Sequence, residues 1–427
     1  MGSLEKSFSR FPGFNNRVNS VVLLPDGGII AGGNFTTYQG IPRLRIAKLK
    51  ADGSLDTTFD SSSGFNGNII SLAIHPDGGV IAGGFFTTYG VTARQSIAKL
   101  NGTTAALDTT FDSSSGFNNS VTSLAIHPDG GVIAGGFFTT YGVTPRQRIA
   151  KLDGTTAALD TTFDSSSGFS GSVFSLAIHP DGGVITGGFF STYGVTARQS
   201  IAKLDGTTAA LDTTFDSSSG FSGFVFSLAI HPDGEVIVGG SFSDYKGTTR
   251  QRIAKLDGKT AALDTTFDSS SGFNFFVEAL AIHPDGGVIA GGDFTTYGGV
   301  TREHIAKLNG TTAALDTTFD PGNGFGGFVL SLALQPNGKI VVGGDFFFYQ
   351  GFLTQNIARL YGSPLKSAVG ESFAFRKSLK VGDIIVGNNF TIPSGDTPAQ
   401  EPGSICLDIT RILIRKLDGS VGIIGLT

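Results

Sequence analysis

Residues 121–172 read VTSLAIHPDGGVIAGGFFTTYGVTPRQRIAKLDGTTAALDTTFDSSSGFSGS, and nearly the same words precede and follow them. The proline of the PDG turn (PNG in the last copy) marks the register at Pro25, Pro76, Pro128, Pro180, Pro232, Pro284 and Pro336. The spacing is 51 residues once and 52 residues five times. Seven copies at one period are typical of an array of supersecondary units, so the fold is decided at the level of the repeat.

Each repeat contains short segments with the apolar alternation of β-strands. Val121–Ile126 and Val132–Gly136 flank the Pro-Asp-Gly turn, and this predicts a tight hairpin because Pro fixes φ and Gly accepts a positive φ. Ile149–Leu152 and Leu159–Phe163 predict two further strands. The diglycine at 135–136 is costly in a strand unless something must approach the backbone closely, and we expect neighbouring repeats to meet there.

Four short strands in 52 residues, without helical periodicity, predict a blade of a β-propeller. Seven blades can close into a ring, and closure removes the exposed sheet edges of an open stack. The last copy of the third strand, Ile357–Leu360, is not followed by an LDTTF segment, whereas the chain begins with the matching Leu4–Phe8. We therefore predict an all-β, seven-bladed propeller over residues 1–361, in which Leu4–Phe8 completes the last blade.

The repeat also resembles a known family. Leu24–Asp60 carries, in order, the PDG turn, the diglycine, I-A-K-L and L-D-T-T-F, and Leu334–Leu360 carries the matching PNG turn, diglycine and I-A-R-L. In this order of motifs the chain is similar to the delta-60 repeat, a bacterial and viral β-propeller repeat, over residues 3–361. The resemblance implies a propeller and no particular chemistry.

The repeat stops at Tyr361, and residues 362–427 have a different pattern. Short apolar runs between Gly, Pro and Asn residues predict a small β appendage, the runs being Asp383–Val386, Phe390–Ile392, Ser404–Leu407, Ile412–Ile414 and Val421–Leu426. Residues 395–402 predict a loop. The segment from Pro402 to Gly419 resembles the ending of bacteriophage tail and fibre proteins, although Val421 and its neighbours stand where that ending usually has Trp. We expect this module to dock or to oligomerise.

Composition and motifs narrow the classes of function. The net charge is −5 with no block of like charges, so nucleic acid is not an expected partner. There is no run of 18 apolar residues and no apolar stretch near the N-terminus, so we expect neither membrane insertion nor a signal peptide. Cys406 is the single cysteine, which excludes an intrachain disulfide. The sequence contains no GxSxG, HExxH or P-loop motif. Near-identical blades also do not supply the different residues that an active site needs, so we expect no enzyme and no cofactor.

A histidine precedes the turn in five repeats, at His75, His127, His179, His231 and His283. A metal ring is one interpretation, but zinc needs three or four ligands about 2 Å from one ion, and equivalent residues of adjacent blades are held apart. A structural role at the end of the strand is the favoured interpretation, and we expect no metal.

Candidate binding residues recur on loops that we expect at one face of the ring. The repeated Arg could form an anion-binding crown or could bond loop carbonyls and an Asp, and we favour the structural role. The repeated Tyr is first of all a packing residue. Loop tips after each SSSGF differ where the surrounding repeats do not. If this face binds a ligand, the candidate contacts are Tyr89, Arg94, Asn118, Asn119, Tyr141, Arg146, Tyr193, Arg198, Phe224, Tyr245, Arg250 and Phe275.

These patterns predict a non-enzymatic structural or adhesive protein, in the first place a virion component such as a phage tail, fibre or baseplate part. Its expected partners are other virion or surface proteins through the C-terminal module, a host glycan or receptor at the propeller face, and further copies of itself. A glycan-binding propeller on a bacterial surface is the second hypothesis. An enzyme acting in the central channel is the third, and a cytoplasmic location is an alternative to the virion and the surface.

Overall fold

A computed structural model describes residues 2–8, residues 13–362 and five short strands beyond them. The chain divides into two compact units, Met1–Ser363 and Pro364–Thr427. All regular elements of the described residues are β-strands. No helix of this part of the chain has the length and hydropathy to cross a membrane.

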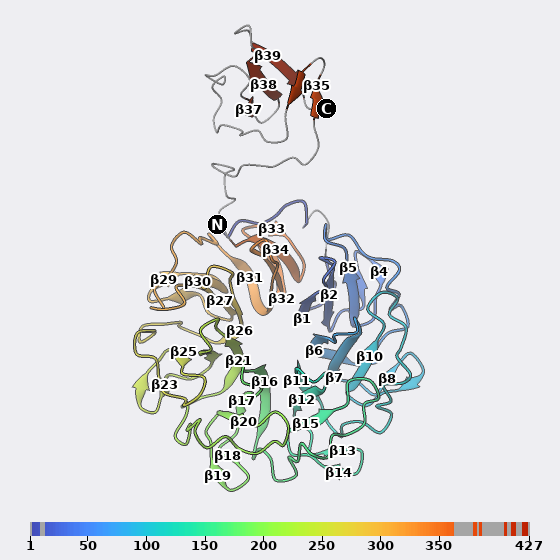
Figure 1. The fold of residues 1–427 in the computed structure, drawn as a ribbon, viewed down its shortest axis with the longest axis vertical. Coiled ribbons are helices and arrows are strands. Elements are labelled where there is room, and N and C mark those ends of the chain that lie inside the picture. Colours follow the sequence, from blue (N-terminus) through green and yellow to red (C-terminus); the bar gives the residue numbers. More distant parts are fainter. Residues whose placement is uncertain are drawn as a thin grey trace. The chain divides into compact units, whose positions relative to one another are not determined.

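The first unit is the predicted seven-bladed β-propeller, with its blades arranged in sequence around a ring (Figure 1). Blades one to six each have a three-stranded antiparallel sheet, and the sheet of blade seven has four strands. The inner strands are β1 (Val18–Leu23), β6 (Asn68–Ile74), β11 (Val121–Ile126), β16 (Ser172–Ile178), β21 (Val225–Ile230), β26 (Val277–Ile282) and β31 (Phe325–Leu334). The second strands are β2 (Ile29–Gly33), β7 (Val80–Phe85), β12 (Val132–Gly136), β17 (Val184–Phe189), β22 (Val236–Gly240), β27 (Val288–Gly292) and β32 (Lys339–Tyr349).

The third strands carry the I-A-[KR]-L motif: β5 (Ile46–Leu49), β10 (Ile97–Leu100), β15 (Ile149–Leu152), β20 (Ile201–Leu204), β25 (Ile253–Leu256), β30 (Ile305–Leu308) and β34 (Ile357–Tyr361). A small outer hairpin joins the second and third strands: β3 (Thr37–Tyr38) with β4 (Ile41–Pro42), β8 (Thr88–Tyr89) with β9 (Thr92–Ala93), β13 (Thr140–Tyr141) with β14 (Thr144–Pro145), β18 (Thr192–Tyr193) with β19 (Thr196–Ala197), β23 (Asp244–Tyr245) with β24 (Thr248–Thr249), and β28 (Thr296–Tyr297) with β29 (Val300–Thr301). In blade seven, β33 (Phe352–Leu353) pairs with the end of β32.

The predicted fourth strand is shorter than expected. The LDTTF segment forms only one isolated bridge per blade, such as Leu152 with Leu159, and Leu159–Phe163 is not a continuous strand. The physical reason lies in the next residues. Asp160 accepts hydrogen bonds from the backbone N–H and the hydroxyl of Thr162, and the chain therefore turns where a strand would continue.

The first residues of the chain complete blade seven, as predicted. Leu4 bridges Leu360, Gly2 N–H donates to the Tyr361 carbonyl, and Glu5 N–H donates to the Arg359 carbonyl. The Glu5 carboxylate also accepts from Arg359 Nε at 2.6 Å and from Lys339 Nζ at 2.9 Å. Blade seven is thus closed by backbone pairing and by a charge cluster that joins both ends of the ring.

The hydrophobic core lies between blades. Seven clusters of buried side chains each combine residues of two neighbouring blades; one joins Ile81 and Ile97 to Val121 and Leu124, for example. The diglycine is explained by the same contact. A Cβ on Gly135 would lie 2.5 Å from Val173 Cγ1 of the next blade, so only glycine fits.

A belt of serine hydroxyls links the inner strands around the ring. Ser123 Oγ, for example, accepts from Leu176 N–H of the next blade at 3.0 Å. The same bond joins Ser20 to Leu72, Ser71 to Leu124, Ser175 to Leu228, Ser227 to Leu280 and Ser331 to Val21. Blade six has Ala279 at this position. The belt therefore lacks one of its seven members, between blades six and seven.

The second unit contains strand pairs. β35 (Leu379–Val381) pairs with β36 (Ile384–Val386), and β37 (Ile405–Leu407), β38 (Arg411–Arg415) and β39 (Val421–Gly425) form a three-stranded sheet. Four of the apolar runs thus contain strands, and β35 was not predicted. The predicted run Phe390–Ile392 and the predicted loop 395–402 lie outside the described residues.

Candidate functional site

The inner strands give the ring two faces with different chemistry. The face at their C-terminal ends carries the Pro-Asp-Gly turns, and we call it the turn face. The face at their N-terminal ends carries the SSSGF loops and the outer hairpins, and we call it the loop face. The two chain segments of the loop face lie side by side, since Phe117 bridges Tyr141, as predicted for the Tyr and SSSGF loops.

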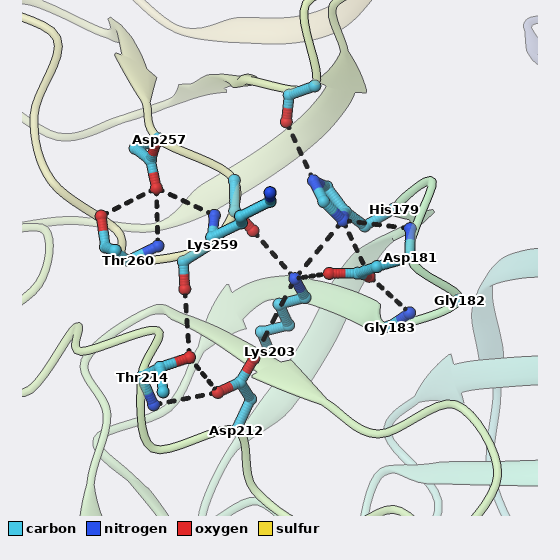
Figure 2. A network of polar contacts seen from close by, with 12 residues as sticks. His179, Asp181, Gly182, Gly183, Lys203, Asp212, Thr214, Asp257, Lys259 and Thr260 are labelled. Carbon is cyan, nitrogen blue, oxygen red and sulfur yellow. Dashed lines mark hydrogen bonds and ion pairs between the residues drawn. The ribbon is translucent and has the colours of Figure 1, made fainter.

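On the turn face, a buried lysine is the centre of a polar network (Figure 2). The side chain of Lys203 is 3% exposed, and its Nζ donates to Asp181 at 2.5 Å and to the Gly258 carbonyl of the next blade at 3.0 Å. His179 lies beside it, with Nδ1 2.8 Å from Asp181 and Nε2 3.0 Å from the Gly234 carbonyl of the next blade. The network therefore ties one blade to the next.

The same network recurs around the turn face, which supports the structural interpretation of the histidines. His75, His127 and His231 bond carbonyls of the next blade in the same way. Burial alone would raise the pKa of Asp181, but bonds from Lys203, the Gly183 N–H and His179 outweigh it and lower the pKa to about 2. In the described residues no three His, Cys, Asp or Glu side chains converge as metal ligands.

The predicted tyrosines of the loop face are buried. Tyr89, Tyr141, Tyr193 and Tyr245 are at most 9% exposed, and each hydroxyl donates to the carbonyl of an alanine about 16 residues later. Burial raises the pKa of Tyr141 to about 12. The prediction of these tyrosines as ligand contacts is therefore corrected: their rings pack against the SSSGF phenylalanines, and their hydroxyls are already bonded.

The predicted arginines are buried in the same way. Arg94, Arg146, Arg198 and Arg250 are 4–5% exposed. Arg94 donates to the Ala93 carbonyl at 2.8 Å and lies 3.4 Å from Asp112, and the other three repeat this arrangement with Asp164, Asp216 and Asp268. A surface crown of arginines is thus not present, and the structural interpretation is the one that fits.

The two predicted asparagines are exposed, but their amides serve the framework. Asn118 Oδ1 accepts from the backbone of Thr139 and Thr140, and its Nδ2 donates to the Thr139 hydroxyl. Asn119 Oδ1 accepts from Ser120 N–H. The residue type at this position varies, but the hydrogen bonds to the backbone are kept. In the next blade the Ser170 hydroxyl accepts from the equivalent N–H groups, those of Ser191 and Thr192.

The remaining two predicted residues, Phe224 and Phe275, belong to an exposed aromatic cluster. Phe224 is 38% and Phe275 is 41% exposed. Ring contacts at 4.1–6.4 Å connect them into one cluster, which we call the aromatic crescent: Phe137, Phe174, Phe189, Phe224, Phe226, Phe275 and Phe276. The crescent extends over blades three to six of the loop face.

A β-bulge places the variable side chains of the crescent. In blade three, Val121 pairs with Gly136 and Ser123 pairs with Gly135, so Thr122 is one residue too many for the partner strand. Every blade has this bulge, yet six different residue types occupy it, and only Phe occurs twice: Asn19, Ile70, Thr122, Phe174, Phe226, Glu278 and Leu330. Bulges re-aim side chains, and they are frequent next to binding sites.

The crescent borders a groove between blades four and five. Phe189 and Phe224 both line it, and their rings are in edge-to-face contact with centroids 4.4 Å apart. The groove has a volume of about 340 Å³, and its lining is completed by Ser170, Gly171, Phe190, Ser191, Gln199, Ser200, Phe221, Ser222 and Gly223. Its size suits an apolar side chain or a short segment.

One carboxyl group lies at the end of the crescent. Glu278 is the extra residue of blade six, and burial, with a smaller effect from Asp293, raises the pKa of its carboxyl to about 7. Burial also raises the pKa of Asp293. Arg17 acts in the opposite direction on Glu278, and His304 does so on Asp293. This end of the crescent thus holds two acidic groups whose carboxyl pKa values are raised.

Sequence reasoning missed most of this site. It found Phe224 and Phe275 at the loop tips but not Phe174, Phe226 and Glu278. A column-by-column comparison of the seven copies would have found them, since the bulge column is a strand position with six different residue types in seven repeats. The residue after the diglycine, which includes Phe137 and Phe189, also varies: Asn34, Phe85, Phe137, Phe189, Ser241, Asp293 and Asp345.

Solved structures similar to this chain are propellers with low sequence identity. The WD40 propeller domain of Doa1 aligns over 84% of this chain and 96% of its own, with a TM-score of 0.54 and 17% identity. The extracellular domain of the one component system BT4673 from B. thetaiotaomicron aligns over 97% of this chain and 52% of its own (TM-score 0.52, 14% identity). PorZ, a surface component of the type-IX secretion system of Porphyromonas gingivalis, aligns over 84% and 48% (TM-score 0.50, 14% identity). This chain thus spans about half of the last two.

No curated protein matches the chain. A family model does match: the beta-propeller domain of unknown function DUF5122, a family often called the delta-60 repeat, aligns with residues 24–59, 231–267, 283–319 and 335–360. These four segments contain the turn, the diglycine and the third strand on which the resemblance to the delta-60 repeat was based. The structural likeness shows the fold, and in these four segments the chain is similar to a β-propeller repeat family.

Proposed function

We propose that this protein is a non-enzymatic binding platform that holds a protein partner on the aromatic crescent of its loop face. The observation that carries the proposal is where the blades differ. The framework positions repeat almost unchanged, whereas the bulge column, the residue after the diglycine and the loop tips after SSSGF change from blade to blade and bring seven phenylalanines together. Exposed apolar patches of this kind are typical of interaction sites.

The chemistry of the crescent favours a protein over a glycan. Sugars need polar groups beside the aromatic rings, but the nearby Tyr141 and Tyr193 hydroxyls and the Asn118 amide are occupied by the framework. The exposed rings are phenylalanines, which offer no donor or acceptor. A glycan-binding propeller of a bacterial surface remains the second candidate, because aromatic rings also stack on sugars.

The proposed setting is a structural or adhesive assembly, in the first place a virion. The reason for this part of the proposal is the resemblance of residues Pro402 to Gly419 to the ending of bacteriophage tail and fibre proteins. In this setting the module of residues 364–427 docks to another subunit or oligomerises. Mass spectrometry of purified particles tests the location directly. Particles that lack the protein, together with its recovery from a bacterial surface fraction, would replace the virion by the surface.

Panning of a random twelve-residue display library against the immobilised full chain tests the crescent. The double variant Phe189→Ser with Phe224→Ser introduces the residue that a neighbouring blade has at the equivalent position, Ser241 and Ser172 respectively. The blades should therefore fold unchanged. We expect peptides selected on the native chain to lose at least tenfold in affinity on this variant. The matched control is Val143→Thr with Val195→Thr, which alters two exposed hairpin tips of the same face. Selected peptides that bind the Phe variant and the control equally would contradict the proposal.

A further inference from the structure

The carboxyl group of Glu278 has no bonded partner in the part of the chain that the structure describes. The influences on it are burial, Asp293 and Arg17, and none is a hydrogen bond. The Asp293 carboxyl is influenced by burial and by His304, again without a hydrogen bond. All other strongly perturbed carboxyl groups of the ring, such as Asp181, are bonded to a lysine or to backbone N–H groups. A half-buried carboxylate without a partner costs free energy in the absence of a ligand.

Glu278 lies where the aromatic rings end. It occupies the bulge column on β26, next to Phe226 in the same column on β21, and these inner strands pack side by side. The ring of Phe276, two residues before Glu278, is 5.8 Å from the ring of Phe226. Equivalent side chains of adjacent blades do meet in this column, since Phe174 and Phe226 are also 5.8 Å apart.

Aromatic faces and a carboxylate form a recognition site for a cation. An ammonium or guanidinium group gains cation–π attraction from the rings and a charge-assisted hydrogen bond from the carboxylate. The basic side chains already near Glu278 and Asp293 are Arg17 and His304, and they do not bind the two carboxyl groups in this way. Arg17 is exposed, and its influence on Glu278 is smaller than that of burial or of Asp293. The His304 ring Nδ1 lies 3.0 Å from the Gly292 carbonyl and its Nε2 3.9 Å from Glu303.

We propose that the Glu278–Asp293 pair receives a basic side chain, Lys or Arg, of the apolar protein segment that docks on the aromatic crescent. This proposal rests on the proposed function and specifies its partner: an apolar stretch that fills the Phe189–Phe224 groove, with one basic residue that reaches blade six. A divalent metal is not the favoured occupant, because no third acidic or histidine ligand joins the pair in the described residues.

The test uses the display library described above and the full chain. Peptides selected on the native chain should combine apolar residues with a Lys or Arg. Each is then synthesised with that residue and with norleucine in its place, which keeps the apolar stem and removes the charge. We expect the basic form to bind at least tenfold more tightly to the native chain, and the two forms to bind alike to the variant Glu278→Gln with Asp293→Asn.

The matched control is Asp153→Asn with Asp205→Asn on the turn face. It removes the same charge, and the fold tolerates it because Asn101 and Asn309 occupy the same position in blades two and six with the same turn hydrogen bonds. The control should bind both peptide forms as the native chain does. Equal loss on the control would assign the effect to net charge and would contradict a local site.

The pH dependence gives a second readout. The basic peptide should lose about tenfold in affinity from pH 8 to pH 5.5, because protonation of Glu278 removes its charge, and the norleucine form should not. If the selected peptides lack a basic residue, or if the basic and norleucine forms have the same pH dependence, the proposed cation site is wrong. The proposed binding of a protein segment to the crescent would be unaffected by that result. A library without any crescent-dependent peptide would overturn the proposed function as well.

Discussion

The turn face and the loop face are built from the same repeat, and they treat polar groups in opposite ways. On the turn face Lys99, Lys151 and Lys203 each have a carboxylate, a carbonyl of the next blade and a histidine as partners. On the loop face the side chains at the bulge are of six types in seven blades, and the Glu278 carboxyl has no bonded partner among the described residues. The difference teaches that the turn face maintains the ring, whereas the loop face is where the blades could diverge without loss of the fold.

The largest expected effect concerns the closure of blade seven. Deletion of residues 1–8 removes the Leu4–Leu360 bridge and leaves Arg359, which is 6% exposed, without the Glu5 carboxylate. We expect a loss of at least about 4 kcal/mol in the free energy of unfolding, since an unpaired buried charge and an open edge both destabilise. Urea denaturation measures this. Unchanged stability would show that the closure contributes nothing.

The next effect concerns the turn face. Lys203→Met should destabilise the ring by about 2–4 kcal/mol, because it leaves the Gly258 carbonyl and Asp181 without their shared donor. Binding at the crescent should not change. Lys259→Met, on an exposed turn of the next blade, is the control and should cost less than about 0.5 kcal/mol. A loss of peptide affinity in Lys203→Met would break the proposed separation of the two faces.

The pH dependence of this network has a definite sign. The five carboxyl groups Asp77, Asp129, Asp181, Asp233 and Asp285 have a pKa of about 2 in the folded protein, below the usual value of an unfolded chain. Their stabilising contribution is therefore present above pH 4 and is lost as the pH falls from 4 to 2. Lys203→Met should show a smaller acid-induced loss than the native chain in urea titrations at pH 5 and pH 3.

A smaller effect of opposite sign is expected on the loop face. The pKa of Glu278 is about 7 in the folded protein, so the folded protein holds this proton more tightly than the unfolded chain does. The native chain should therefore gain stability from this group as the pH falls from 8 to 5. Glu278→Gln should stabilise the ring by about 2 kcal/mol at pH 8 and by little at pH 5. An equal effect at both pH values would show that the carboxyl does not titrate in this range.

The smallest effect concerns the serine belt. Ala279→Ser should add the missing hydroxyl bond to Leu332 N–H of blade seven and stabilise the ring by about 0.5–1.5 kcal/mol. Ser227→Ala, which removes an existing bond to Leu280, should have the opposite effect. Urea midpoints of the two variants provide the measurement, and a gain in both would contradict the belt as a stabilising element.

The sequence was sufficient for the architecture but not for the site. Val121–Ile126, Val132–Gly136 and Ile149–Leu152 were predicted with their observed bounds, because alternation and turn residues define them locally. The closure by Leu4 followed from counting copies. A packing role for Tyr141 and a structural role for Arg146 were the favoured interpretations of the repeat, but their partners depend on which loops meet in space.

The aromatic crescent escaped prediction for a related reason. Phe174 and Phe226 are 52 residues apart, and nothing local to either shows that a bulge aims both toward one place. The fourth strand was overpredicted because LDTTF has strand-like composition, whereas Asp160 turns the chain after a single bridge. Such side chain–backbone bonds compete with strand formation and are decided by geometry.

The closure of blade seven also decides how the ring responds to a mechanical load. Gly2 is paired with Tyr361 in an antiparallel arrangement, so residues 2 and 361 leave this pair at the same end. A force between the N-terminal segment and residue 362 would separate the pair one hydrogen bond after another, and the ring would open at low force. A tether at residue 362 alone would pull on β34, which β32 holds along one edge and residues 2–5 along the other. The protein should therefore bear tension between a ligand on its loop face and an anchor after residue 362 far better than tension between its two ends.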